Sequence, residues 1–237
     1  MCALLERWPT LEALQKVSAD TLRSFFHKQH CRKEELIESR ITAIAEAESA
    51  LKDRAVVEAK VAVVKVVVQL IQVLHEGIEG LNRQIQEAAE AHPDFFIFDS
   101  LPGAGVVMAP RLLAAFGSQR ERYQNAAEVQ TLSGIAPVTE SSGKSSWVHF
   151  RFACSKFLRQ TFHEFAAHSI PQSPWAHAYY ELQRRRGKKH HAAVRALAFK
   201  WIRVIYRCWK ERVAYDEKVY LAALAKQKSP LLAATER

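Results

Sequence analysis

The residues best suited to chemistry lie in a short polar stretch, residues 139–146, which reads Thr-Glu-Ser-Ser-Gly-Lys-Ser-Ser. A serine hydroxyl attacks a phosphodiester when a base or a metal removes its proton and cations neutralise the charge that develops. Ser141 and Ser142 stand directly before Gly143 and Lys144. Further cations follow shortly after this stretch, at Arg151, Lys156 and Arg159. On the residues alone, a flexible surface loop is the commoner explanation, and it stays open at this point.

A second pattern, at residues 101–113, predicts a grip on a DNA backbone. It reads Leu-Pro-Gly-Ala-Gly-Val-Val-Met-Ala-Pro-Arg-Leu-Leu, which fits a helix-hairpin-helix motif. Gly103 can adopt a positive φ and close the preceding helix, and Gly105 leaves room for a phosphate at the N–H groups of the next helix. Ala109 allows the two helices to pack closely, and Arg111 adds a cation. An ordinary turn between two helices is the alternative.

A basic run and a basic helix face follow later in the chain. The helix predicted after Gly187 has an apolar face that includes Val194, Leu197 and Trp201, and its opposite face is cationic. Such a stripe can follow a phosphate backbone, with an affinity that falls as salt rises. A solvated helix face without a ligand is the alternative. The candidate nucleic-acid contacts of this region are Arg184, Arg185, Arg186, Lys188, Lys189, Lys200, Arg203, Arg207 and Lys210.

The positive charge is concentrated in the part of the chain that contains these motifs. Residues 93–237 hold 22 Lys and Arg against 11 Asp and Glu, a net charge of +11. Residues 1–92 hold 12 against 14, a net charge of −2, and the whole chain carries +9. This asymmetry indicates that the second part of the chain binds nucleic acid.

The composition excludes several classes of protein. With 49% hydrophobic and 25% charged residues, the chain is expected to fold as a soluble globular protein. Its four cysteines are too scattered for a disulfide framework or a zinc site built from cysteine pairs, which suits a reducing cytoplasm. The start of the sequence does not resemble a signal peptide, and Lys65 and Gln69 interrupt the apolar segment 61–74, so no membrane span is predicted. No metal site is predicted in this chain.

A long helical arm is predicted over residues 33–92. Apolar residues recur there at spacings of three and four, the pattern of a coiled coil. The arm is either one long helix or a helical hairpin bent near residues 52–54. Its expected role is dimerisation or that of a spacer; a helix stripe buried in a single core is the alternative.

The rest of the chain completes a mainly α fold. Short helices, a remnant or linker, are expected over residues 1–32, and a frayed tail over residues 226–237. Between arm and tail, residues 93–225 are expected to form a compact helical, DNA-binding domain that contains the helix-hairpin-helix-like motif. Its last helix is predicted to run from about 190 to 225.

Several motifs in one order carry a resemblance to a known family. These are residues 101–113, then Leu-Ser-Gly-Ile-Ala-Pro at 132–137, Ser-Ser-Gly-Lys at 141–144 and Phe-Leu-Arg at 157–159. Together they resemble the C-terminal transposase domain of the Piv/MooV-type DEDD insertion-sequence transposases, the IS-one-ten group of bridge-RNA-guided recombinases. The similarity covers roughly residues 94–185, and the helical arm before it matches the family's layout.

The resemblance implies a chemistry and a set of partners. In that family an N-terminal RNase-H-like domain supplies four acidic residues that bind divalent metal, and the C-terminal domain supplies a serine that becomes covalently linked to DNA. By motif, Ser142 is the expected nucleophile, with Ser141 as second candidate. The implied partners are DNA, a guide RNA and further copies of this chain, bound through the arm. The implied location is the bacterial cytoplasm, at the nucleoid.

The sequence also departs from the family pattern. No acidic RNase-H-like domain is recognisable, Cys154-Ser155 stands where the family has Gly-Asn, and Pro110 removes a helical N–H. We therefore expect a truncated transposase with no cofactor of its own, whose divalent metal, Mg²⁺, comes only with an acidic domain from elsewhere. The alternatives are a non-catalytic helix-hairpin-helix DNA-binding protein, an inactive transposase remnant, or a coiled-coil adaptor.

Overall fold

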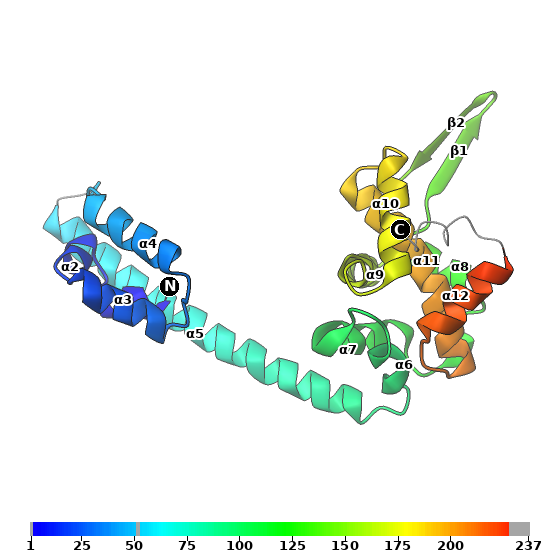
Figure 1. The fold of residues 1–237 in the computed structure, drawn as a ribbon, viewed down its shortest axis with the longest axis horizontal. Helices are drawn as coiled ribbons and strands as arrows, with labels where there is room; N and C mark the ends of the chain where they lie inside the picture. Colours follow the sequence, from blue (N-terminus) through cyan, green and yellow to red (C-terminus); the bar gives the residue numbers. More distant parts are fainter. Residues whose placement is uncertain (1, 51–52, 228–237) are drawn as a thin grey trace. The chain divides into compact units, whose positions relative to one another are not determined.

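The computed structural model describes residues 2–50 and 53–227 (Figure 1). The fold is mainly α, as predicted, with one two-stranded sheet among the described residues. The chain divides into two compact units between Leu81 and Asn82. Within the described ranges, no helix combines the length and the apolarity that a bilayer span needs. The predicted tail lies outside the described residues from 228 onward.

The first unit is a small helical cluster followed by a long helix. Ser18 begins the helix that follows it, because the Ser18 side chain accepts a hydrogen bond from the N–H of Thr21. Phe25 and Phe26 of that helix are buried in a core cluster with Ile37. The side-chain amide of Gln15 donates to the carbonyl oxygens of Ile44 and Ala47, which lie in and just after the last turn of the next helix. Its helices are α1 (Cys2–Arg7), α2 (Leu11–Gln15), α3 (Ala19–Lys28), α4 (Glu34–Glu46) and most of α5 (Arg54–Glu90).

The predicted arm is therefore two helices, because the chain leaves the helical conformation at Ala47. One face of α5 stays largely unburied although it is apolar. Its side chains recur at spacings of three and four, and they are 45% to 63% exposed. They are Val63, Val67, Leu70, Leu74, Ile78, Leu81 and Ile85. Near the end of α5, Ala89 joins the core of the second unit, which explains why the unit boundary falls before the predicted one at residue 92.

The second unit is built around the buried face of α11, against which α8, α9 and α10 pack. That face was predicted correctly: Val194, Leu197, Trp201 and Ile205 are fully buried. A β-hairpin projects from this unit (Figure 1). Its elements are α6 (Phe95–Asp99), α7 (Gly105–Phe116), the 3-10 turn η1 (Arg120–Arg122), α8 (Ala126–Leu132), β1 (Val138–Ser142), β2 (Ser145–His149), α9 (Lys156–Ser169), α10 (Pro174–Arg185), α11 (His190–Glu211) and α12 (Glu217–Lys226).

Two local predictions were wrong. The single helix expected over residues 190–225 is two helices, because Arg212 adopts a left-handed conformation with φ of 54° and ends α11. The polar stretch 139–146 is not a loop: most of it forms β1 and the start of β2.

The segment after α11 folds back and closes the core of the second unit. The backbone N–H of Tyr215 donates to Ser100 Oγ over 2.8 Å, and the indole N–H of Trp175 donates to the Tyr215 hydroxyl, also over 2.8 Å. Leu224 of α12 is buried in the same core. Residues 215–224 thus tie together α6, α10 and α11.

Candidate nucleic-acid interface

The β-hairpin carries both predicted serine nucleophiles near its tip. Ser141 pairs with Ser146, and Ser142 pairs with Ser145 across the turn made by Gly143 and Lys144. Gly143 has φ of 57°, which suits the first central position of a two-residue hairpin turn. All these side chains are exposed, so a large substrate can reach them.

Alternation along the strands places the two serines on opposite faces of the hairpin. Ser142 shares its face with Glu140 and Trp147, and Ser141 lies on the other face with Val148. In the described part of the chain, neither serine side chain makes a hydrogen bond, so no base activates a serine directly.

An ion pair lies further down the face of Ser142. His149 Nε2 lies 2.7 Å from Glu140 Oε1, and His149 Nδ1 lies 3.1 Å from the carbonyl oxygen of Phe150. These two acceptors raise the pKa of His149, and the hydrogen bond that His149 donates to Glu140 raises it most. Because both ring nitrogens are occupied, His149 cannot remove a proton from Ser142 in this arrangement.

At the base of the hairpin two guanidinium groups face one aromatic ring. The Arg159 carbon Cζ lies 4.0 Å from the centroid of the Phe150 ring, and that of Arg195 lies 4.7 Å from it. Arg159 comes from α9 and Arg195 from α11, so helix packing brings the two like charges together. Burial, with the charge of Arg159, lowers the pKa of Arg195.

The position of Arg159 is fixed by a close approach to Gly134. A Cβ atom at residue 134 would lie 2.9 Å from Arg159 Nη2 and 2.7 Å from the sulfur of Cys154. Gly134 also has φ of 66°, which disfavours any side chain. Only glycine therefore leaves Arg159 free to lie over Phe150, while its Nη2 donates to the carbonyl groups of residues 151 and 152.

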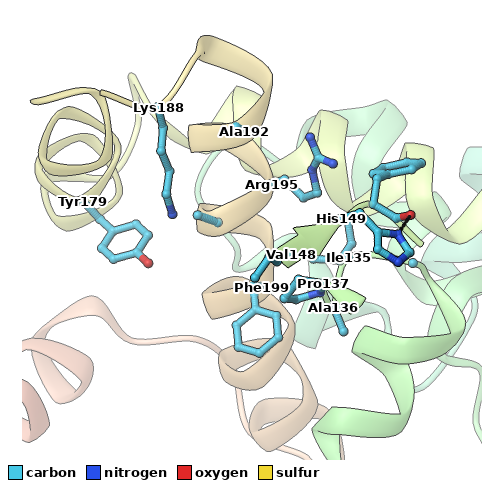
Figure 2. Close-up of a pocket in the computed structure, with 13 residues that line it drawn as sticks. Ile135, Ala136, Pro137, Val148, His149, Tyr179, Lys188, Ala192, Arg195 and Phe199 are labelled. Atoms are coloured by element: carbon cyan, nitrogen blue, oxygen red, sulfur yellow. Dashed lines mark hydrogen bonds between the residues drawn. The ribbon is translucent and has the colours of Figure 1, made fainter. Parts of the chain in front are cut away.

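Two cavities adjoin this cluster, and Ile135, Phe150 and Arg195 line both. The larger, about 530 Å³, lies between the base of the hairpin and the helices α10 and α11 (Figure 2). The smaller, about 310 Å³, is lined by cationic and imidazole side chains from α9 and α11. The lining of the smaller cavity includes Lys156, Arg159, His163, His191 and Arg195.

The predicted helix-hairpin-helix region is present, with different details. Gly103 has the expected positive φ of 80°, but α6 already ends at Asp99, so Gly103 lies in the following turn and does not cap that helix. Gly105 begins α7, and nothing lies within 4 Å of where its Cβ would be, so the space predicted for a phosphate exists. Arg111 lies further along α7, half-buried.

Arg111 is held by the protein itself. It forms an ion pair with Glu164 of α9 and contacts the hydroxyl of Thr161 over 3.3 Å. Burial acts to raise the pKa of Glu164, but hydrogen bonds from Arg111 and Gln160 hold that pKa below its usual value. Arg111 therefore joins α7 to α9, which leaves less of its charge for DNA than its sequence position indicates.

The other predicted cations differ in how free they are. Lys144, Lys156, Arg185, Arg186, Lys188, Lys189 and Arg203 are exposed. Arg151 is half-buried, and its Nε is buried without a hydrogen bond among the described residues. Four others are engaged. Arg184 donates to the carbonyl of Lys188, Lys200 lies over the ring of Tyr179, Arg207 pairs with Glu211, and Lys210 donates to the carbonyl of Arg120.

Comparison with known proteins finds a family that part of the second unit resembles. Residues 97–181, which include α7, the hairpin and α9, match the family described as Transposase IS116/IS110/IS902 family. These residues are thus similar to a transposase domain. The matched range confirms the resemblance drawn from the motifs between residues 101 and 159.

The proteins that the chain resembles come from bacterial insertion elements. The mini-circle putative transposase for IS117 of Streptomyces coelicolor is 31% identical over 146 residues, which are 62% of this chain and 35% of the relative. An uncharacterized protein of the insertion element IS110, from the same organism, is 32% identical over 62% of this chain and 36% of its own length. The IS900 protein of Mycobacterium paratuberculosis is 26% identical over 93% of this chain and 55% of its own length. The chain thus spans between about a third and just over half of these relatives.

Seven of the predicted nucleic-acid contacts, from Gly103 to Arg159, lie in the matched range, and the nine from Arg184 onward lie beyond it. Sequence reasoning missed three residues: Phe150, Arg195 and His163. Arg195 stands next to the buried Val194 and outside the predicted cationic face, so its spacing gave no signal. The α9–α11 contact, which brings Arg195 to Phe150, appears only in the folded structure.

Proposed function

We propose that this chain is the DNA-binding, serine-bearing part of an insertion-sequence transposase of the site-specific recombinase type. The family match over residues 97–181 carries the proposal, because that range encloses the exposed hairpin with Ser142 beside its turn. The excess of positive charge in residues 93–237 supports DNA as the substrate.

In the proposed step, Oγ of Ser142 attacks the phosphorus of a DNA phosphodiester. A bond forms between that oxygen and phosphorus, and the bond from phosphorus to one deoxyribose oxygen breaks. The serine proton passes to a base, and the released deoxyribose oxygen takes up a proton. In this proposal Lys144, at the hairpin turn, offsets the negative charge that builds up on the phosphate oxygens. Ser141, on the other face of the hairpin, is the second candidate.

The described residues do not fit a divalent metal. No group of three His, Cys, Asp or Glu side chains that could hold a metal ion occurs in residues 2–50 and 53–227. The carboxylates near the hairpin are already paired, Glu140 with His149 and Glu164 with Arg111. Mg²⁺ prefers several oxygen ligands. We therefore propose that Mg²⁺ is bound by an acidic domain outside these residues.

A strand-nicking assay tests the serine assignment. The chain is mixed with the acidic RNase-H-like domain of a relative, Mg²⁺ and insertion-element DNA, and denaturing gels report nicked strands and protein bound covalently to DNA. We expect Ser142→Ala to abolish both products, and Ser118→Ala, an exposed serine distant in sequence from the hairpin, to leave them unchanged. Full activity in both Ser142→Ala and Ser141→Ala would refute a serine nucleophile.

A non-catalytic DNA-binding protein is the second candidate function. The observation that favours it is that neither serine has a hydrogen-bonded base within the described residues. It predicts salt-dependent DNA binding with no covalent adduct in the assay above. An adduct lost only in Ser142→Ala would exclude it.

We further propose that the exposed apolar face of α5 joins copies of this chain. Seven apolar side chains at coiled-coil spacing are 45% to 63% exposed, an arrangement that a partner helix of the same pattern would bury. Light scattering after gel filtration should report an oligomer that the double variant Leu70→Glu, Leu74→Glu converts to monomer, whereas the control Lys65→Glu should not. A wild-type monomer at micromolar concentration would refute this.

Guide RNA binding and a bacterial cytoplasmic location at the nucleoid are proposed from the resemblance alone. The exposed cations between Arg185 and Lys189 are the residues we assign to the RNA. Retention of an element-derived transcript by the purified chain, and its loss when these cations are replaced by Gln, tests the assignment.

A further inference from the structure

We propose that the two cavities on either side of Phe150 form one site for a single unpaired DNA nucleotide, with the base in the larger cavity and its phosphate at Arg159 and Arg195. This deepens the proposed function and rests on it for the identity of the substrate. Arg195 lies outside the family motifs and outside the matched range, whereas Gly134 to Pro137 of the larger cavity belong to one of these motifs.

The smaller cavity has the chemistry of a phosphate site. Arg159 and Arg195 lie 4.0 Å and 4.7 Å from the same ring centroid, so two like charges are held close together. Among the described residues, neither guanidinium forms an ion pair with a carboxylate, and Nε of Arg159 is buried without a hydrogen-bond partner. Such an arrangement costs free energy, which an anion between the two groups would recover.

The carboxylate that lines this cavity does not neutralise it. Glu164 is bonded to Arg111 and to Gln160 instead. Lys156 adds a third cation to the lining, and His163 and His191 lie with their ring centroids 5.6 Å apart. The cavity thus retains a net positive charge that matches a phosphodiester.

The larger cavity has the size and the walls for a base. Its volume of about 530 Å³ lies in the range of small-ligand sites, and its lining contains no acidic residue. Tyr179, Phe199 and Pro137 offer flat apolar surface, and Lys188 lies at the α10 side (Figure 2). A base in a duplex cannot enter such a cavity, so the ligand is an unpaired nucleotide.

The position of the site relative to the serines points to the DNA strand that is cleaved. Val148 of β2 lines the larger cavity and lies two residues from Ser146, the partner of Ser141. At about 3.4 Å per strand residue, the serines lie about 7 to 10 Å along the hairpin from Val148. This equals about two or three nucleotides at the stacked spacing of one strand. A nucleotide held here would fix the strand on which the serine acts.

The test measures binding, not cleavage. Fluorescence anisotropy measures how tightly the purified chain binds three labelled DNA ligands. They are hexathymidine, the same oligonucleotide with one abasic residue, and a duplex of equal length. We expect the intact single strand to bind most tightly. Arg195→Gln should weaken its binding about tenfold or more, because a charge-assisted contact is lost. The control Arg83→Gln makes the same change of charge on α5 and should not.

A second variant probes the base cavity without any change of charge. Ala192→Leu adds bulk to the lining, so the preference for thymidine over the abasic residue should fall about tenfold. Ala196→Leu serves if that variant does not fold, as judged by circular dichroism.

Three results would overturn the proposal: equal binding of the abasic and intact strands, no loss of affinity in Arg195→Gln, or tighter binding of the duplex or of a matched RNA. None depends on the serine, so the assays are repeated in Ser142→Ala. If Ser142→Ala binds the single strand as the wild type does, and the wild type does not cleave DNA, the serine chemistry is contradicted but the nucleotide site is not.

Discussion

Gly103 and Gly105 offer a matched pair of substitutions whose effects on stability differ for a visible reason. Both have positive φ, 80° and 53°, so alanine at either position carries the strain of the left-handed region, about 1–2 kcal/mol. At residue 103 the new Cβ would also lie 2.6 Å from the carbonyl oxygen of His168 and 3.1 Å from the amide nitrogen of Ser169. These are backbone atoms at the end of α9, so no side-chain rotation relieves the contact.

The expected costs follow from these contacts. Forcing a methyl group into packed structure adds about 1–3 kcal/mol, so Gly103→Ala should lower the free energy of unfolding by about 2–5 kcal/mol and Gly105→Ala by about 1–2 kcal/mol. For a domain of this size the difference corresponds to a melting temperature lower by about 2–12 °C in Gly103→Ala. Urea and thermal unfolding, followed by circular dichroism at 222 nm, measure both variants. If Gly105→Ala proved as costly as Gly103→Ala, the packing of this turn against α9 would not be what makes glycine necessary.

Three further predictions concern single side chains. Asp94 is buried and paired with Arg120 over 2.7 Å, and this hydrogen bond lowers the pKa of the carboxyl group. Asp94→Asn should therefore lower the free energy of unfolding, measured with urea at pH 7, by about 3–5 kcal/mol. In the wild type, the contribution of this pair to stability should disappear as the pH falls through the lowered pKa. The hydrogen bond with Glu140 raises the pKa of His149, so an NMR titration should place this pKa above 6.5, and Glu140→Gln should lower it. The contribution of the pair to stability should be complete below pH 6.5 and should be lost as the pH rises through the raised pKa. An unchanged titration of His149 in Glu140→Gln would contradict this. Burial raises the pKa of Cys208 to about 11, so iodoacetamide at about pH 8 should leave it unmodified in the folded chain while it labels more accessible thiols.

The sequence was sufficient where local chemistry decides the structure. The spacing of Val194, Leu197 and Trp201 predicted the buried face of α11, and the need for a positive φ at Gly103 was also read correctly. Asn125 begins α8 in the way expected of an asparagine before a helix, because its side chain accepts a hydrogen bond from the N–H of Glu128 over 3.1 Å. Each of these features depends on residues within one or two helical turns.

Features that depend on distant contacts or on unusual backbone could not be predicted. The strand β1 has no alternation of apolar and polar residues, and only its pairing with β2 makes it a strand. Arg212 ends α11 in a conformation usually taken by glycine, so no helix-breaking residue marked the position. The cluster around Phe150 needs α9 and α11 side by side, which places residues 159 and 195 on one ring.

The return of Tyr215 to Ser100 has a consequence for how the protein is made. During synthesis α6 leaves the ribosome long before Tyr215 does. Trp175 gains its hydrogen-bond partner, the Tyr215 hydroxyl, only when residue 215 has emerged. The core around α11 therefore stays open until residues 215–224 have been synthesised, since Leu224 fills its last apolar position. A nascent chain that has emerged only as far as residue 212 would leave the core around Trp175 uncovered, which makes it a target for chaperones and proteases.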